Sequence, residues 1–173
     1  MIAAAIVTRA SGGNTKKEKP LSVDDRKWME RAYAQAQDSY DHGGLPIGSA
    51  LVRHRGDGED ELLGEGHNQR VQDGDPIAHG EMDAIRRAGR QRSYRDTTIY
   101  TTLSPCMMCA GTIVQFRIPR VVVGENRNFG GNEEFLRQNG VEVVILDDAK
   151  CIELMGRFIR ERPDVWNEDI GEE

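Results

Sequence analysis

The chain has 173 residues, of which 38% are hydrophobic and 30% are charged, a balance typical of a soluble globular protein. No apolar run approaches the roughly 18 residues that a membrane-spanning helix needs. The formal net charge of −6 argues against a long surface that binds nucleic-acid phosphates. Three cysteines are too few for a disulfide framework, and no basic segment precedes the short apolar start as it would in a secretory leader. We therefore expect a reducing, cytoplasmic location.

After a short apolar start, residues 11–20 are polar, contain glycine and lack apolar periodicity. This composition predicts a flexible N-terminal tail over 1–20. A dense pattern of apolar residues follows, and its length predicts a single domain over 21–173. We find no internal repeat.

A helix is expected first, because apolar residues recur every four positions from Trp28 to Tyr40. Ser22 is expected to cap this helix, and Gly43-Gly44 to end it. The later elements are expected in this order: strands at 47–52 and 62–66, a loop at 68–76, a helix at 78–88, a strand at 97–103, a helix capped by Ser104 and ending near 116, a strand at 120–124, a helix at 132–138, a strand at 141–146 and a helix at 148–162.

Five predicted strands alternate with helices, which predicts an α/β fold with a mixed sheet between layers of helices. The last stretch, 163–173, is too short and polar to add a layer to the core, although it holds one large aromatic residue, Trp166. Cys151 falls in the last predicted helix, and we interpret it as a buried, inert thiol.

Two short motifs offer the side chains of a zinc site, namely His79-Gly80-Glu81 and Pro105-Cys106-Met107-Met108-Cys109. Cysteines three apart at a helix start share one face, and the helix N-terminus favours thiolate. His79, at the start of the preceding predicted helix, adds an imidazole. Three such ligands leave the fourth position of a tetrahedral zinc ion open for water, which indicates catalysis rather than structure.

Taken alone, each half of this pattern has other interpretations. A C-x-x-C pair also occurs in redox sites and in structural zinc sites, and Glu81 could simply complement a helix dipole. Together they form the H-x-E…P-C-x-x-C pattern of zinc-dependent base deaminases. In that chemistry a carboxylate close to the metal, but not bound to it, moves protons, and Glu81 is placed for this role.

At these residues the chain resembles the cytidine deaminase-like superfamily, and within it the fungal-type cytosine deaminases. The similarity extends from about Trp28 to the end of the chain. The segments that carry it, besides the two zinc motifs, are Gly44-Leu45-Pro46-Ile47-Gly48, Gly66-His67-Asn68, Thr98–Cys109, Val122–Asn126, Asn128-Phe129, Glu161-Arg162-Pro163, Trp166 and Glu168–Glu172.

The resemblance implies a three-layer α/β/α sandwich around a mixed five-stranded sheet, assembled as a homodimer with one zinc ion (Zn2+) per subunit. It implies hydrolysis of the free base cytosine to uracil and ammonia in pyrimidine salvage, with water as co-substrate and with no nucleic-acid or membrane partner. The roles that it implies are zinc ligands for His79, Cys106 and Cys109, a proton shuttle for Glu81, hydrogen bonds to the pyrimidine from Asn68, Asp169 and the Gly80 backbone, and enclosure of the ring by Phe129, Trp166 and Ile47. The segment 163–173 would then cover the site.

Simple chemistry agrees with two of these roles. Asp169 could accept a hydrogen bond from N1–H of a free base, a position that carries the sugar in a nucleoside. Asn68 could donate and accept at once, which suits the neighbouring carbonyl and N–H of the ring.

Three alternatives stay open on the sequence alone. A tRNA or DNA adenosine deaminase shares the zinc motif, but would need a basic surface and a pocket open to a strand. A deaminase of another amino-heterocycle is a second enzymatic alternative. A structural zinc scaffold without catalytic activity is the third, although such sites usually have four protein ligands.

Overall fold

The structure is a computed structural model that describes residues 23–55 and 59–172. The predicted tail at 1–20 and the predicted cap Ser22 lie outside the described residues. Among the residues described, no helix is both long and apolar enough to cross a membrane.

Five strands form one mixed sheet, in the order β2-β1-β3-β4-β5. The strands are β1 (Gly48–His54), β2 (Asp60–His67), β3 (Thr97–Leu103), β4 (Arg120–Glu125) and β5 (Glu142–Ile145). β1 runs antiparallel to both β2 and β3, whereas β3, β4 and β5 run parallel to one another. Every residue of the central strand β3 is buried, as its run of β-branched residues predicts.

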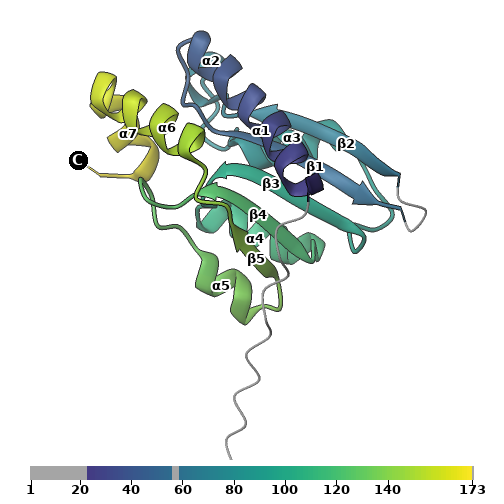
Figure 1. The fold of residues 1–173 in the computed structure, drawn as a ribbon. Coiled ribbons are helices and arrows are strands. Elements are labelled where there is room, and N and C mark those ends of the chain that lie inside the picture. The colour runs from purple at the N-terminus through teal and green to yellow at the C-terminus, as the bar shows by residue number, and fades with distance from the viewer. Residues whose placement is uncertain (1–22, 56–58, 173) are drawn as a thin grey trace, which may run out of the picture.

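Helices cover both faces of this sheet (Figure 1). They are α1 (Val23–Asp41), α2 (Arg70–Asp73), α3 (Gly80–Ala88), α4 (Met107–Phe116), α5 (Glu133–Gln138), α6 (Ala149–Glu161) and α7 (Pro163–Ile170). α1 and α6 pack on one face, and α3, α4 and α5 pack on the other. The predicted α/β/α sandwich with a mixed five-stranded sheet is therefore confirmed.

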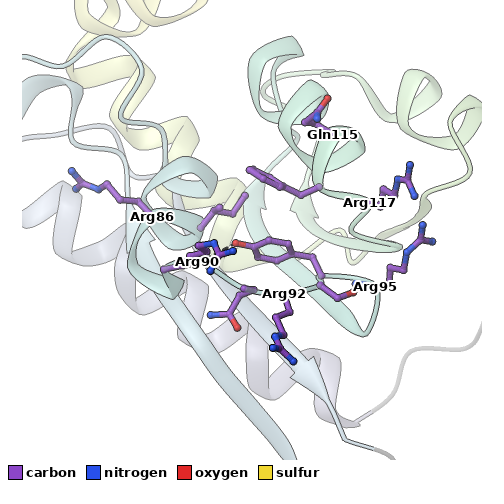
Figure 2. Close-up of a pocket in the computed structure, with 12 residues that line it drawn as sticks. Arg86, Arg90, Arg92, Arg95, Gln115 and Arg117 are labelled. Atoms are coloured by element: carbon purple, nitrogen blue, oxygen red, sulfur yellow. Dashed lines mark hydrogen bonds between the residues drawn. The ribbon is translucent and has the colours of Figure 1, made fainter.

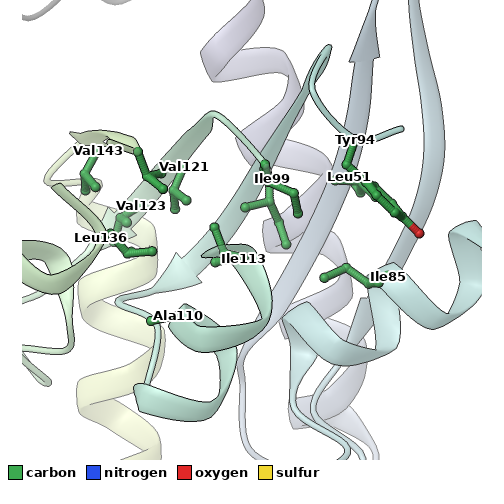
Figure 3. Close-up of a cluster of buried hydrophobic side chains, with 12 residues drawn as sticks. Leu51, Ile85, Tyr94, Ile99, Ala110, Ile113, Val121, Val123, Leu136 and Val143 are labelled. Atoms are coloured by element: carbon green, nitrogen blue, oxygen red, sulfur yellow. The ribbon is translucent and has the colours of Figure 1, made fainter. Parts of the chain in front are cut away.

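Alternate residues of the strands point to opposite faces and build two separate core clusters. In β1 and β4, Leu51 and Val121 face α3, α4 and α5, whereas Val52 and Val122 face α1 and α6. Figure 3 shows the first cluster, in which Ile85, Ile113 and Leu136 of the helices meet Leu51, Ile99 and Val121 of the sheet. Burial of each such side chain contributes about 1.5–3 kcal/mol. These contacts between strands and helices hold both helix layers against the sheet.

A short helix, α2, forms inside the segment that was predicted to be a loop, so that prediction was wrong at 70–73. Its start is held by Asn68, whose Oδ1 accepts a hydrogen bond from the Arg70 backbone N–H at 3.0 Å. Gly74 ends it in a left-handed conformation with φ 65°. This local side-chain contact gives the backbone one turn of helix without any apolar periodicity.

The predicted cap of α4 was also wrong, because Cys106 occupies the N-cap position in place of Ser104. The Ser104 hydroxyl instead donates to Glu133 Oε1 at 2.8 Å and accepts from the Gly131 backbone N–H. These partners lie far away in the sequence, so the local pattern did not reveal them.

The C-terminal stretch forms a helix of its own, α7, where we expected only a polar segment. Pro163 ends α6 as predicted, but it also stands in the first turn of α7, a position that suits its fixed φ and missing N–H. Trp166 is buried in a third cluster with Leu45, Phe158 and Leu103 at one end of the sheet. α7 is thereby attached to the end of the sheet where β3 terminates.

Candidate active site

His79 is the residue immediately before α3, in an extended conformation. The helix starts so close to Ile47, the residue before β1, that a Cβ atom on Gly80 would lie 2.8 Å from the Ile47 carbonyl oxygen. Only glycine fits there, because real Cβ atoms do not approach backbone atoms so closely. Gly80 therefore lets the start of α3, with His79, pack directly against the start of β1.

The two motif cysteines are placed by the start of α4, which follows β3. Cys106 occupies the N-cap position in an extended conformation, and Cys109 is fully buried in the first turn. The Cys106 Sγ atom lies 3.5 Å from Nδ1 of His79. One ligand atom from each of His79, Cys106 and Cys109 falls within 4.8 Å of the others. The three predicted metal ligands therefore meet at the starts of two neighbouring helices.

This donor set fits zinc. Tetrahedral zinc with bonds of about 2.3 Å to sulfur and about 2.1 Å to nitrogen would separate the two ligand atoms by about 3.6 Å. The Sγ–Nδ1 separation of 3.5 Å matches that edge. Within the described residues the group contains only three ligands, so a fourth position stays open, as in catalytic sites.

Cys106 and Cys109 shift each other's pKa. Hydrogen bonding from Cys109 is the largest effect that lowers the pKa of Cys106, to about 4, and His79 assists while burial opposes the shift. The pKa of Cys109 is raised, because it donates to Cys106 and is buried close to Glu81. Burial lowers the pKa of His79, but the Cys106 hydrogen bond and the nearby carboxylates outweigh it, so the net shift is upward. The site thus already favours a thiolate, the form that binds a metal.

Glu81 lies one residue into α3 with a side chain that is almost fully buried. Burial is the main cause that raises its pKa to about 7, and the negative charge of Cys106 adds to the effect. His79 and the Cys109 hydrogen bond act in the opposite direction. A carboxyl group with such a pKa can both take up and release a proton near neutral pH.

A cavity of about 300 Å³ opens beside these groups. Its size is at the lower end of the range for small-molecule sites, about 300–1,000 Å³. It is lined by Ile47, His79, Glu81, Leu103, Ser104, Cys106, Met107, Phe129, Asn132, Trp166, Asp169 and Ile170. The rings of Phe129 and Trp166 meet edge to face, with centroids 6.0 Å apart. Seven of the predicted site residues therefore surround one cavity.

Asn68 and Gly80 do not line this cavity, and Cys109 lies behind it in the metal group. The Asn68 backbone N–H donates to the Ile47 carbonyl at 2.8 Å, which places Asn68 directly behind a cavity wall. Its side chain is fully buried, and Nδ2 has no hydrogen-bonding partner among the described residues. A buried donor without a partner costs roughly 1–3 kcal/mol, so it is a natural position for a ligand contact.

Asp169 reaches the cavity from α7. Its Oδ1 accepts a hydrogen bond from Nη1 of Arg70 at 2.7 Å and lies 3.8 Å from Nε2 of His79. No hydrogen bond engages its second oxygen, Oδ2, within the part of the chain that the structure describes. This oxygen is free to accept a hydrogen bond from a molecule in the cavity.

Sequence reasoning missed five lining residues and the arginine that holds Asp169. The five are Leu103, Ser104, Met107, Asn132 and Ile170. Their proximity to Cys106 or to the C-terminal motif could have indicated four of them, since they flank residues that were chosen. Arg70 lies two residues after Asn68, whereas Asn132 carried no such local indication.

The other three histidines and Cys151 lie apart from the metal group. The rings of His42, His54 and His67 contact acidic or backbone partners away from the metal group. Cys151 is buried on α6, and burial raises the pKa of its thiol.

Comparison with known proteins gives relatives that match most of the chain. The chain is 53% identical to the cytosine deaminase of Candida albicans over 154 residues, which cover 88% of this chain and 100% of that protein. It is 35% identical to a tRNA-specific adenosine deaminase of Streptococcus pyogenes over 82% of this chain and 94% of the relative. A solved structure from a study of A-to-I editing by tRNA:A34 deaminases superposes with a TM-score of 0.65 at 28% identity, over 75% of this chain and 99% of the other.

Residues 22–125 match the zinc-binding region of cytidine and deoxycytidylate deaminases, and this stretch includes His79, Glu81, Cys106 and Cys109. The match covers more than half of the chain and both motifs of the zinc site. The chain therefore belongs to the cytidine and deoxycytidylate deaminase zinc-binding family.

Proposed function

We propose that this protein hydrolyses the free base cytosine to uracil and ammonia, with water as co-substrate. The observation that carries the proposal is the 53% identity with the cytosine deaminase of Candida albicans along that protein's whole length. His79, Cys106 and Cys109 would hold one zinc ion per subunit, since their ligand atoms lie within 4.8 Å of one another. A zinc ion with an open coordination position supplies an activated water near neutral pH.

Glu81 is the proton shuttle in this proposal. It lines the cavity next to two metal ligands, where it is shielded from bulk solvent. As the C4–O bond forms, its carboxylate accepts the proton of the attacking water and delivers it to ring N3. It then takes the remaining proton from the new C4 hydroxyl and passes it to the C4 amino group, so that the C4–N bond breaks, the C4 carbonyl of uracil forms and ammonia leaves.

In this proposal, groups that lie far apart in the sequence recognise the substrate. Oδ2 of Asp169 accepts a hydrogen bond from N1–H of the base, while Arg70 holds the other oxygen in place. Because a nucleoside carries its sugar at N1, it would leave this carboxylate without a donor. The unpartnered Nδ2 of Asn68 and the backbone N–H of Gly80 contact the pyrimidine edge. Ile47, Phe129 and Trp166 enclose the ring.

The same features argue against a nucleic-acid substrate, although tRNA-specific relatives exist. α7 brings Trp166, Asp169 and Ile170 into the cavity wall, and a strand would have to displace them. The small cavity suits a free base better than a nucleotide within a folded RNA. A structural scaffold is disfavoured by the buried acid beside a three-ligand group.

The setting that we propose is a cytoplasmic homodimer in pyrimidine salvage. Cys106, Cys109 and Cys151 are all free thiols, and zinc-binding thiols need reducing conditions. Met107 lines the cavity and yet remains 56% exposed, so a second copy packed on α4 would shield both this residue and the site.

A substrate panel tests this function. Ammonia release should be measured with cytosine, cytidine, adenine, guanine and a tRNA anticodon stem, in the absence of any other nucleic acid. We expect release from cytosine alone, with uracil formed in equal amount. Turnover of the anticodon stem or of cytidine in preference to cytosine would overturn the proposal. Gel filtration with light scattering tests the homodimer separately.

A further inference from the structure

A strongly basic segment lies apart from the zinc site. Residues 86–95 contain five arginines and no acidic residue, in a chain whose net charge is −6. The segment comprises the last turn of α3 and the loop that leads to β3. Nothing in the deamination chemistry uses it, so its charge needs a separate explanation.

This segment forms one wall of a second cavity, of about 660 Å³, which we call the basic hollow (Figure 2). It is lined by Ile85, Arg86, Gly89–Arg95 and Gln115–Arg117. α3 and α4 both begin at the zinc ligands and end at the hollow. Nine or ten residues of helix at 1.5 Å per residue place it about 15 Å from the metal group. The hollow and the active site are therefore separate sites at opposite ends of the same two helices.

Most of the arginines there have no partner within the protein. Arg86 and Arg87 both pair with the buried carboxylate of Asp83. Four others line the hollow with neither an ion pair nor a side-chain hydrogen bond among the described residues: Arg90, Arg92, Arg95 and Arg117. These groups repel one another, and an anion that lies among them would be attracted by several of them at once.

The dipole of α3 accounts for only some of these arginines. A cation stabilises the C-terminal turn of a helix, but the effect falls off within that turn. It explains Arg86 and Arg87 on α3, whereas Arg92 and Arg95 lie in the loop beyond the helix. Figure 2 shows Arg95 and Arg117 extending in the same direction from two different segments. Guanidinium groups arranged in this way can grip a phosphate with several charge-assisted hydrogen bonds.

The hollow also offers an aromatic surface. The ring of Phe116 packs on Tyr94 with centroids 5.1 Å apart, and 42% of Phe116 remains exposed. The Tyr94 hydroxyl donates to the Gly89 carbonyl, which fixes the inner ring. A flat ring could stack on Phe116 while its charged end reaches the arginines. A phosphate without a ring would contact the arginines but not Phe116.

We propose that the basic hollow binds a nucleoside polyphosphate, whose phosphates contact Arg95 and Arg117 and whose base stacks on Phe116. The volume of the hollow is within the range for ligands of this size. The site goes beyond deamination, and its occupancy does not depend on the proposed function of the zinc site.

Titration calorimetry of the full-length, zinc-loaded protein tests the site directly. The probes are ATP, UTP and inorganic tripolyphosphate at about 0.15 M salt, where exposed charges are screened beyond about 8 Å. We expect saturable binding of the nucleotides, and weaker binding of tripolyphosphate because it has no ring. Arg95→Glu and Arg117→Glu should each weaken binding of all three probes about tenfold or more. Phe116→Ala should remove the advantage of the nucleotides over tripolyphosphate.

The matched control is Arg160→Glu, which reverses an exposed arginine of α6 outside the hollow and should leave binding unchanged. Arg95→Gln supplies a neutral replacement, and circular dichroism checks that each variant is folded. Lack of saturable binding, or binding that survives both charge reversals, overturns the proposal. So does a changed mass in solution for either reversal, because the arginines would then contact a second copy. Affinity for oligonucleotides that rises with their length would indicate a general nucleic-acid surface instead.

Discussion

Arg70 and Asp169 lie 99 positions apart and are joined by a hydrogen bond of 2.7 Å between Nη1 and Oδ1. Both side chains are largely buried. The pair attaches α2, which follows β2, to α7 at the end of the chain. Asp169 lines the active-site cavity and Arg70 does not. Arg70 therefore holds one wall of the cavity in place from outside it.

Replacing Arg70 with alanine tests whether this pair positions the substrate acceptor. A hydrogen bond between charged groups contributes about 1.5–3 kcal/mol, so we expect KM for cytosine to rise about tenfold to a hundredfold. Zinc content should stay at one ion per subunit, because no metal ligand is touched. Steady-state kinetics and metal analysis measure both. Glu168→Gln removes the exposed second partner of Arg70 and should leave KM near the wild-type value; an unchanged KM in Arg70→Ala would contradict the assignment.

Glu81→Gln separates zinc binding from proton transfer. The amide keeps the shape of the side chain but cannot carry a proton, so kcat should fall by about two to four orders of magnitude. Metal analysis should still find zinc, since Glu81 does not belong to the ligand group. Glu134→Gln on the exposed side of α5 is the control and should retain activity. Normal turnover in Glu81→Gln would remove this residue from the mechanism.

Cys109→Ala should abolish both zinc binding and activity, because only two ligands of the described group remain. Metal binding also stabilises the fold, so the variant should unfold at a lower temperature than wild type. Cys151→Ala provides the comparison, since it removes a buried thiol of α6 that lies outside the metal group. It should keep full zinc content. Retention of zinc by Cys109→Ala would refute the ligand assignment.

The buried carboxylate of Asp83 should make a pH-dependent contribution to the stability of the fold. Burial raises the pKa of its carboxyl group, but hydrogen bonds and charges from Arg86, Arg87 and Gln69 outweigh burial, so the net shift is downward. A depressed pKa stabilises the fold above the unfolded value of about 3.9, and this contribution is lost as the pH falls through the lower, folded value. Asp83→Asn should therefore cost about 1–3 kcal/mol at pH 7.

Urea unfolding of wild type and Asp83→Asn across a pH series measures this effect. The difference in free energy of unfolding should be constant near neutrality and should shrink as the pH falls below about 4. Asp164→Asn changes an exposed carboxylate of α7 and serves as the control. A difference that does not depend on pH would mean that Asp83 acts through packing alone.

Local patterns in the sequence were sufficient for the sheet and for the metal ligands. Runs of β-branched residues marked β3 and β4, and the two ligand motifs indicated two helices, although the cap of the second was misassigned. These features depend on neighbours within a few residues, which the sequence displays directly. The mixed sheet and the helix layers also followed from the alternation of elements, whereas the strand order was not predicted.

What the sequence could not reveal depends on partners that only folding brings together. Ser104 was predicted to cap a helix, but in the fold its hydroxyl donates a hydrogen bond to Glu133 instead. The C-terminal stretch looked merely polar, because the surface that buries Trp166 comes from Leu45 and Phe158. Arg70 and Asp169 gave no hint of each other. Such long-range polar contacts have no periodic signature.

The positions of the two tryptophans have a practical consequence. Trp166 stands in the cavity wall against Phe129, whereas Trp28 is buried between α1 and the sheet. In a Trp28→Phe variant all indole emission would arise from the cavity wall. Ligand entry could then be followed optically, in real time and without any label.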